Sequence, residues 1–247
     1  MAFSRRNLIL PLAVFLALAA PLRAQPEASP ALTVRLMSWQ GDLPGLLLAG
    51  AREDVQVDVR EFAFSAEVAV KRGEVLRVSR RAEGTPADEP PPVLAELEIP
   101  PGLRRLLVVL APAPAGSPFP LTGRVWDNSL GAHPVDTVRV LNFSTKALAA
   151  GIGSTRFEVA AGGEGSAAYP HDAAPMVFVQ LAANDGGEWR MARRGLQPLV
   201  PGGRMLCVVR DGRIPAGNIM PEARAETVDV FFINDRRPAG PGAKSAR

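Results

Sequence analysis

Residues 101–109 read Pro-Gly-Leu-Arg-Arg-Leu-Leu-Val-Val, and residues 201–209 read Pro-Gly-Gly-Arg-Met-Leu-Cys-Val-Val. Six of these nine positions are identical, at a spacing of 100 residues. A second pair stands upstream in the same order, with Thr-Val-Arg-Leu-Met-Ser-Trp at 33–39 and Thr-Val-Arg-Val-Leu-Asn-Phe at 137–143. Because chance does not readily produce agreement at two separate places, the sequence predicts an internal duplication.

Between these signatures each copy breaks into short β-type runs separated by turn residues. Val55, Val57 and Val59 alternate with polar residues, which is typical of a strand with one face on a core and one in water. The stretch from Arg104 to Leu110 is almost continuously apolar, as expected in the middle of a sheet. Each copy holds about seven such runs, a number typical of immunoglobulin-like domains. We therefore expect an all-β protein of two tandem immunoglobulin-like antiparallel β-sandwich domains.

The expected parts of the chain follow from these runs and from composition. In order they are a signal peptide (1–24), a flexible lead-in (25–31), domain 1 (32–128), a linker (129–136), domain 2 (137–235) and a disordered basic tail (236–247). The one helix candidate of the mature chain is Leu43 to Arg52, which Pro44 and Gly45 weaken. The stretch from Gly162 to Pro170 is expected to be a loop.

Residues 1–24 have the layout of a secretory signal peptide. A basic start at Arg5-Arg6 precedes an apolar run from Leu8 to Ala20, and Leu22-Arg23-Ala24 offers a cleavage site before Gln25. The apolar run is too short to span a bilayer comfortably, so no stable membrane span is expected after cleavage. Twin-arginine export and an uncleaved anchor are the alternatives. We expect a protein of the bacterial periplasm or cell envelope.

Charge and cysteine content narrow the partners. The chain carries 28 basic and 25 acidic residues, and three of the arginines belong to residues 1–24, so the mature chain has no net charge. Nucleic acid and acidic membranes therefore gain no support as partners. Cys207 is the only cysteine, so no intrachain disulfide forms. Its apolar setting predicts a buried side chain, with a nucleophile or an intermolecular disulfide as the alternatives.

The sequence offers little for catalysis. His133 and His171 are the only histidines, and neither has a second His or a Cys at a ligand spacing, so no metal or other cofactor is expected. Both histidines fall in expected loops and are predicted to be solvated. No Gly-x-Ser-x-Gly motif presents a nucleophile. We expect no enzymatic activity; a hydrolase with an unrecognised site around His171 is the least favoured alternative.

Six residues are candidates for binding, each with a structural alternative. Two arginine pairs recur at matching places of the repeat, Arg35 with Arg139 and Arg104 with Arg204. They could pair with acids on neighbouring strands or hold a ligand carboxylate or a partner's chain end. Trp39 and Trp126 flank the core strands of domain 1, where they could pack internally or stack on a partner or a sugar.

Taken together, these features predict a protein that works by contact with another envelope protein. The groove between the two domains and the unpaired edge strands are the expected contact surfaces. A small-ligand or carbohydrate-binding module is the alternative of a different class. The identity of the partner and the oligomeric state do not follow from the sequence.

Overall fold

The computed structural model describes residues 32–50, 53–82, 84, 86, 88–170, 175–212 and 228–235. Within these ranges the chain forms 16 strands and no helix. The predicted signal peptide (1–24), lead-in (25–31) and basic tail (236–247) lie outside the described residues, as does His171.

Domain 1 is a sandwich of two four-stranded sheets. Its strands are β1 (Leu32–Ser38), β2 (Leu43–Leu48), β3 (Val55–Val59), β4 (Val68–Val70), β5 (Val75–Ser79), β6 (Val93–Glu98), β7 (Arg105–Pro112) and β8 (Leu121–Asp127). The inner sheet has the order β4-β1-β7-β8, and the outer sheet has the order β3-β2-β5-β6.

Domain 2 repeats this plan strand for strand. Its strands are β9 (Thr137–Asn142), β10 (Leu148–Ile152), β11 (Thr155–Val159), β12 (Glu164–Ala168), β13 (Met176–Asp185), β14 (Glu188–Pro198), β15 (Arg204–Asp211) and β16 (Val228–Asp235). The inner sheet is β12-β9-β15-β16, and the outer sheet is β11-β10-β13-β14. Each strand of domain 2 thus occupies the place of the strand eight earlier, so the predicted pair of duplicated β-sandwiches is confirmed.

One strand pair in each domain departs from the predicted antiparallel arrangement. β1 runs parallel to β7, and β9 runs parallel to β15. A parallel pair needs a long crossover connection, and the chain provides one by visiting the outer sheet twice between β1 and β7. Every other pairing of these strands within the sheets is antiparallel.

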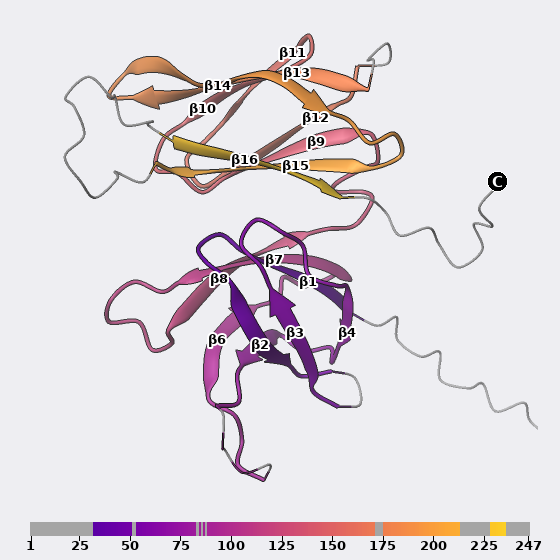
Figure 1. Cartoon of the computed structure of the whole chain (residues 1–247), viewed down its shortest axis with the longest axis vertical. Helices are drawn as coiled ribbons and strands as arrows, with labels where there is room; N and C mark the ends of the chain where they lie inside the picture. The colour runs from indigo at the N-terminus through magenta and orange to yellow at the C-terminus, as the bar shows by residue number, and fades with distance from the viewer. Residues whose placement is uncertain are drawn as a thin grey trace, which may run out of the picture.

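The four sheets stack as layers, with the two inner sheets facing each other (Figure 1). An apolar cluster, here called the interdomain cluster, fills the space between them. It contains Met37, Leu107, Val109, Leu141, Leu206, Val208 and Ile233, with Trp39, Phe62, Phe64, Trp126, Phe143 and Phe231 packed against them. β7 and β15 are therefore covered on both faces, because one face meets the core of its own sandwich and the other meets the opposite domain. This explains why their sequences are almost continuously apolar.

Two predicted elements are wrong. The helix candidate Leu43 to Arg52 is instead strand β2 over its first six residues, because Leu46 and Leu48 are fully buried at a spacing of two and face the core. The expected loop Gly162 to Pro170 contains strand β12. The small side chains of β12 do not form a pattern typical of a strand. The packing requires a small residue, because a Cβ on Gly165 would lie 2.7 Å from the ring of Phe157.

The repeat aligned in the sequence shifts by one residue in space. Thr33 stands opposite Arg105, whereas the equivalent Thr137 stands opposite Arg204. Arg105, not Arg104, is therefore the structural counterpart of Arg204. The Pro-Gly turns of the two copies still correspond, so domain 1 has one extra residue between turn and strand. Apolar side chains on both faces of these strands hide the shift from a sequence comparison.

The turn between β13 and β14 makes a testable demand on backbone conformation. Gly186 and Gly187 form this two-residue turn with φ of 64° and 94°, values that L side chains rarely adopt. We expect Gly186→Ala and Gly187→Ala each to lower the free energy of unfolding by about 1 kcal/mol, measured by urea denaturation. Gly131→Ala is the matched control, because Gly131 has an ordinary φ and its nearest neighbouring atom would lie 3.7 Å away. An equal loss in the control would contradict this explanation.

Candidate functional site

Both predicted tryptophans lie in the interdomain cluster. The ring of Trp39 is 4.9 Å from that of Phe143, and the ring of Trp126 is 5.1 Å from that of Phe143. Trp39 and Phe143 end the equivalent signatures of the two copies, so the duplicated positions meet each other across the contact. The arrangement corresponds to the packing alternative for these tryptophans, with their rings turned into the protein.

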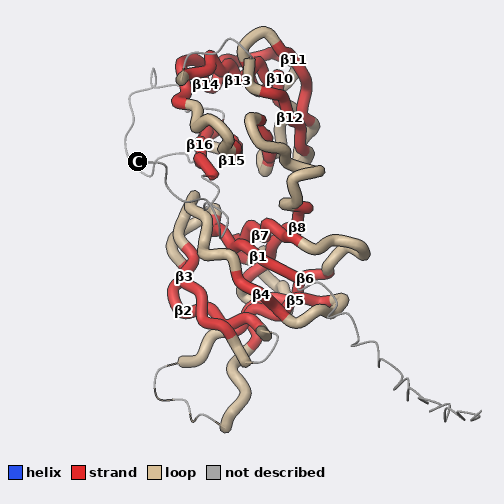
Figure 2. The backbone as a smooth tube through the Cα atoms, turned by 90° about the vertical axis from the view of Figure 1, so that its right-hand side faces the viewer, coloured by secondary structure: helices blue, strands red, loops and turns tan. Residues whose placement is uncertain are grey.

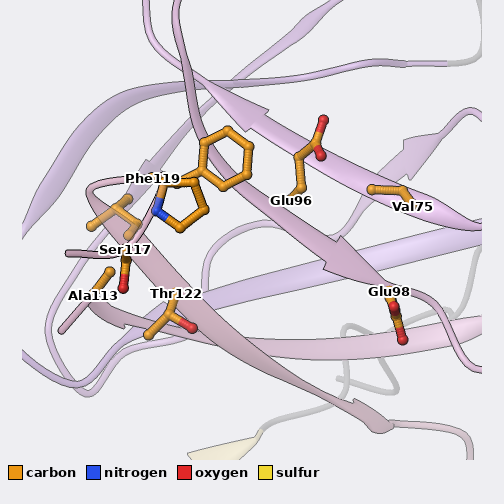
Figure 3. Close-up of a pocket in the computed structure, with 9 residues that line it drawn as sticks. Val75, Glu96, Glu98, Ala113, Ser117, Phe119 and Thr122 are labelled. Carbon is orange, nitrogen blue, oxygen red and sulfur yellow. The ribbon is translucent and has the colours of Figure 1, made fainter.

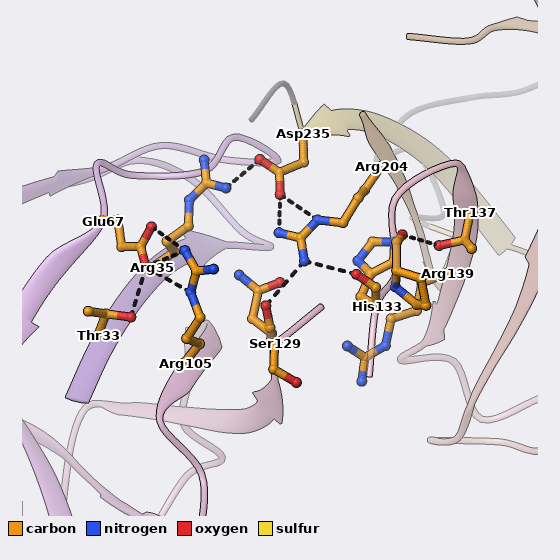
Figure 4. A network of polar contacts seen from close by, with 12 residues as sticks. Thr33, Arg35, Glu67, Arg105, Ser129, His133, Thr137, Arg139, Arg204 and Asp235 are labelled. Atoms are coloured by element: carbon orange, nitrogen blue, oxygen red, sulfur yellow. Dashed lines mark hydrogen bonds and ion pairs between the residues drawn. The ribbon is translucent and has the colours of Figure 1, made fainter. Parts of the chain in front are cut away.

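Three of the predicted arginines make hydrogen bonds across the same contact. Asp235, at the end of β16, is 4% exposed. Its Oδ1 accepts a hydrogen bond from Arg35 Nη1 of domain 1 at 2.5 Å, and its Oδ2 accepts two from Arg204 of domain 2, one of them from Nε at 3.0 Å. The two guanidinium groups bond different oxygens of the carboxylate (Figure 4). One buried carboxylate thus joins the two domains.

Arg139 occupies the place of Arg35 in the second copy and makes the reciprocal contact. Its Nη1 donates to the backbone oxygen of Asp127, at the end of β8, at 2.6 Å, while its Nε donates to Glu164 at 3.0 Å. Each of these two arginines therefore reaches the end of the last strand of the opposite domain. This reciprocity is the mark of an isologous contact, in which both copies use the same surface.

The environment of Asp235 keeps this carboxylate charged. Burial alone would raise the pKa of Asp235, but the hydrogen bonds and positive charges of Arg35 and Arg204 outweigh that effect and lower the pKa below its usual value. Arg204 is anchored further, because its Nη1 donates to the backbone oxygens of Asn128 and His133, each at 3.1 Å. Arg35 and Arg204 therefore share one carboxylate, and both guanidinium groups make their hydrogen bonds within the protein.

Arg104 does not join this network. Its side chain is exposed, and the neighbouring Arg105 takes the structurally equivalent position. Arg105 pairs with Glu67 at 2.9 Å, a contact within domain 1. The structure therefore brings five of the six predicted residues to the interdomain contact and leaves Arg104 apart from them.

An arginine that the sequence analysis did not single out holds the opposite end of the contact. Arg210 Nη1 donates to the backbone oxygen of Trp39 at 2.5 Å, and its Nε donates to Asp229 at 3.1 Å. Its guanidinium also lies over the rings of Phe62 and Phe231, which stack on each other with centroids 3.6 Å apart. The sequence does mark Arg210, because it is the charged residue that ends the apolar run 204–210. Its partners in domain 1 could not be identified, because they are far away in the sequence.

His133 is buried, so the prediction of a solvated histidine is wrong for it. The side chain is 2% exposed, because the connection between β8 and β9 is drawn against Arg204 by the bond to the His133 backbone oxygen. Burial and then the positive charges of Arg204 and Arg139 lower its pKa to about 4, although Asp235 and a hydrogen bond to Thr137 act in the other direction. The imidazole is therefore neutral at physiological pH.

Two hollows on the surface give no assembled catalytic group. One of about 400 Å³ is lined by Glu96, Glu98, Ser117 and Thr122, among others. Its carboxylates follow one strand while the hydroxyl-bearing residues lie across from them (Figure 3), and Glu96 is engaged by Arg77 at 2.8 Å. The other, of about 730 Å³, has mainly apolar walls that include four prolines: Pro134, Pro170, Pro175 and Pro201. Its size suits a small molecule, although none of the tryptophans Trp39, Trp126 and Trp189, on which the small-ligand alternative was based, lines it.

The most unusual surface is the outward face of the outer sheet of domain 2. Five large apolar side chains are exposed there, and we call them the apolar outer face: Met176, Phe178, Trp189, Met191 and Leu196. In the pairing of β13 with β14, Phe178 stands opposite Leu196, and the other three residues occupy outward-facing positions further along the same two strands. All five side chains therefore lie on one face of the sheet. The pair of Gln180 and Arg194 separates Met176, Phe178 and Leu196 from Met191 and Trp189. Exposed apolar surface concentrated on one face in this way is typical of interaction sites.

Sequence reasoning missed this face because it could not assign sides. Met176 to Leu181 is apolar at five of six positions, which suits a strand buried on both faces as well as one exposed on one face. In domain 1 the corresponding outward positions are mostly polar: Asp58, Arg77, Glu96 and Glu98, with Val75 among them. The two equivalent sheets have thus diverged on their outward faces while keeping the same core-facing pattern.

The free edge beside this face is protected against strand addition. β14 carries a bulge at Ala192, where the register to β13 shifts. Arg190 and Arg193 stand opposite the buried residues Ala183 and Leu181, so they lie on the core-facing side of β14, yet both are exposed. Bulges and inward-pointing charges are devices that keep edge strands from pairing with other chains. A partner is therefore better accommodated on the face than along this edge.

The chain matches no model of a known protein family and no curated protein. Within the described residues there is no helix long and apolar enough to cross a bilayer. In the same part of the chain, no group of three or more His, Cys, Asp or Glu residues could hold a metal ion.

The bridge at Asp235 predicts a large difference between a buried and an exposed ion pair. We expect Asp235→Asn to lower the free energy of unfolding by about 3 kcal/mol, because it leaves two part-buried guanidinium groups without their shared counter-charge. Glu96→Gln is the control: it breaks a pair whose arginine side chain is 68% exposed, so its effect should stay below about 1 kcal/mol. Chemical denaturation measures both, and similar losses would show that Asp235 does not join the domains.

The neutral His133 predicts a pH dependence of stability. Its pKa is about 4 in the folded protein and about 6.5 in the unfolded chain. Between these values the unfolded chain binds a proton that the folded protein does not, so this contribution is complete above pH 6.5 and is lost as the pH falls toward 4. We expect His133→Gln to remove about 3 kcal/mol of the loss between pH 7 and pH 4.

Denaturation of the protein and of this variant at both pH values tests the assignment. The carboxylates titrate equally in the two proteins, so the difference between the two slopes isolates His133. Identical slopes would mean that the imidazole is accessible to protons in the folded state.

Proposed function

We propose that this protein is exported to the periplasm or envelope of a bacterium and acts there without catalysis, by binding another envelope protein through the apolar outer face. The observation that carries the proposal is the concentration of exposed apolar surface. Five of the eight large apolar side chains that are exposed in the described part of the chain belong to this one face. Water contact with such a surface is unfavourable, and covering it by a partner removes that penalty.

The interior of the domain contact supports the choice of surface. The groove between the domains, which the sequence analysis favoured, is occupied by the interdomain cluster. Three of the four candidate arginines, Arg35, Arg139 and Arg204, have their hydrogen bonds directed to Asp235, Asp127 and Glu164. These residues serve to fix the two domains as a unit, and the two outer sheets lie at the two ends of the stack (Figure 2).

Export and architecture belong to the same proposal. Residues 1–24 have the basic, apolar and small-residue order of a signal peptide. Two stacked sandwiches, to which we assign an immunoglobulin-like character on their size and two-layer build, form a rigid spacer. Such a spacer can present the apolar outer face of domain 2 to a partner while the mainly polar outer sheet of domain 1 remains in water. This arrangement suits a structural, assembly or adaptor role.

The test is capture from envelope extracts with the mature chain, Gln25 onward, as bait. We expect an envelope protein that is retained by the unchanged bait and lost with the double variant Met191→Glu, Leu196→Glu. Binding of the partner would have to bury the two introduced carboxylates, which is unfavourable. Val75→Glu is the matched control, since Val75 is 43% exposed on the equivalent sheet of domain 1, and it should retain the partner. If the double variant retains the same protein, the choice of face is wrong. If the unchanged bait retains no protein, the proposal of an envelope partner is wrong.

A further inference from the structure

The apolar outer face consists of a ridge beside a hollow. The ridge is formed by Trp189, Met191 and Leu196 of β14, of which Met191 and Leu196 are 59% and 57% exposed. The hollow, about 430 Å³, lies over β10 and β13 and is lined by the small residues Ala149, Gly151 and Ala182, with the guanidinium of Arg156 packed over Gly151. Met191 stands directly opposite Ala182, which stands opposite Ala149. Ridge and hollow are therefore neighbours on one surface.

We infer that a second copy of this chain occupies this face, with the ridge of each copy in the hollow of the other. A surface that carries a projection and a matching depression side by side complements itself under a two-fold rotation, which makes both contacts at once. The inference rests on the proposed function, because it names an occupant for the same face. The second copy holds the face when the envelope partner does not.

The charges on the face fit this occupant. Glu158 lies on the rim of the hollow, opposite Ala149, and Arg194 lies on the ridge side, between Met191 and Leu196. Among the described residues neither has an ion-pair partner; Arg194 only covers the ring of Phe178, at 5.6 Å. Placing the ridge in the hollow of a second copy brings the free guanidinium toward the free carboxylate in both contacts.

The other charge at the hollow, that of Arg156, is fixed in place by its own turn. Arg156 Nη1 donates to the backbone oxygens of Gly153 and Thr155, at 2.7 Å and 3.0 Å. Its guanidinium is therefore held against its own turn. Arg156 keeps its positive charge, because its acceptors are neutral backbone oxygens. The two charged groups that face the second copy, Glu158 on the hollow side and Arg194 on the ridge side, are of opposite sign, which favours the pairing of ridge with hollow.

The chain already contains a contact of this kind. Its two inner sheets are equivalent by duplication, and they pack face to face with duplicated positions in contact, as Trp39 and Phe143 show. This contact shows that two equivalent apolar sheet faces of this architecture can pack against each other. The outer sheet of domain 2 is the apolar one of the two equivalent outer sheets, whereas that of domain 1 is mainly polar.

The size of the face sets the strength of the contact. At about 3.4 Å per residue and 4.8 Å between strands, β10, β11, β13 and β14 cover roughly 500 Å² in projection, and the projecting side chains add to the accessible area. Standard interfaces bury about 800 Å² per partner. The contact lies at the lower end of this scale, so we expect a reversible dimer with a dissociation constant in the micromolar range.

The experiment uses sedimentation velocity on the mature chain from about 1 to 100 μM, a range chosen to bracket this affinity. Met191→Glu alters the ridge and Ala149→Lys alters the hollow, where the new amine lies next to Glu158. We expect the unchanged protein to dimerise, and each variant alone to dimerise at least about tenfold more weakly. Val75→Glu, on the polar outer sheet, should dimerise as the unchanged protein does.

An equimolar mixture of the two variants provides the decisive result. One contact of the mixed dimer then combines an unchanged ridge with an unchanged hollow, and the other pairs the introduced carboxylate with the introduced amine. We expect the mixture to dimerise, which also shows that both variants are folded. A mixture that stays monomeric overturns the ridge-in-hollow arrangement.

The remaining outcomes separate this inference from the proposed function. A protein that stays monomeric at 100 μM, or a dimer that both variants leave intact, overturns the inference. An envelope protein whose capture depends on Met191 and Leu196 would still support the proposed function in either case. Conversely, restored dimerisation without any captured envelope protein supports the inference and removes the partner from the proposed function.

Discussion

The contact between the two inner sheets is the constraint on which the rest of the structure depends. Because β7 and β15 lie between two apolar layers, neither can carry the polar alternation of an ordinary sandwich strand. The polar groups that the chain needs there stand at the rim, where Asp235 accepts hydrogen bonds from both Arg35 and Arg204. A single buried charge would be strongly unfavourable; two cations around one carboxylate, with further bonds to backbone oxygens, make the rim stable.

Duplication explains why this contact could arise in one chain. Both domains present the same sheet, and equivalent residues do equivalent work: Arg35 and Arg139 each reach the end of the last strand opposite, and Trp39 meets Phe143. That is the geometry of a symmetric dimer whose halves are joined by residues 128–136. Once joined, the halves were free to differ, and the outer sheets diverged most because neither had to match the other.

The sequence predicted the features that depend on short-range patterns of residues. It missed those that depend on which face of a strand a side chain occupies or on contacts between distant parts of the chain. Alternation at Val55, Val57 and Val59 and the repeated signatures were enough for strands, sandwiches and duplication. The one-residue shift that makes Arg105 the counterpart of Arg204 could not be detected in the sequence. Leu106 and Leu206 are both buried, but Leu106 lies in the core of domain 1 and Leu206 lies in the interdomain cluster. β12 was missed because close approach of Phe157 selects glycine, and His133 because its burial depends on Arg204, far along the chain.

The same limit applied to the candidate site, and it also shows where function can reside. Recurring arginines and tryptophans attracted attention because they are rare and placed alike, yet equivalence in a duplicated chain follows as readily from a shared internal contact as from a shared ligand. Once their hydrogen bonds are assigned within the protein, little of their binding capacity remains. Met191 and Leu196 are the reverse case: ordinary in the sequence, but exposed on a face where a soluble sheet places polar residues. A departure from the expected pattern that stabilises nothing inside the chain is the stronger indication of an external partner.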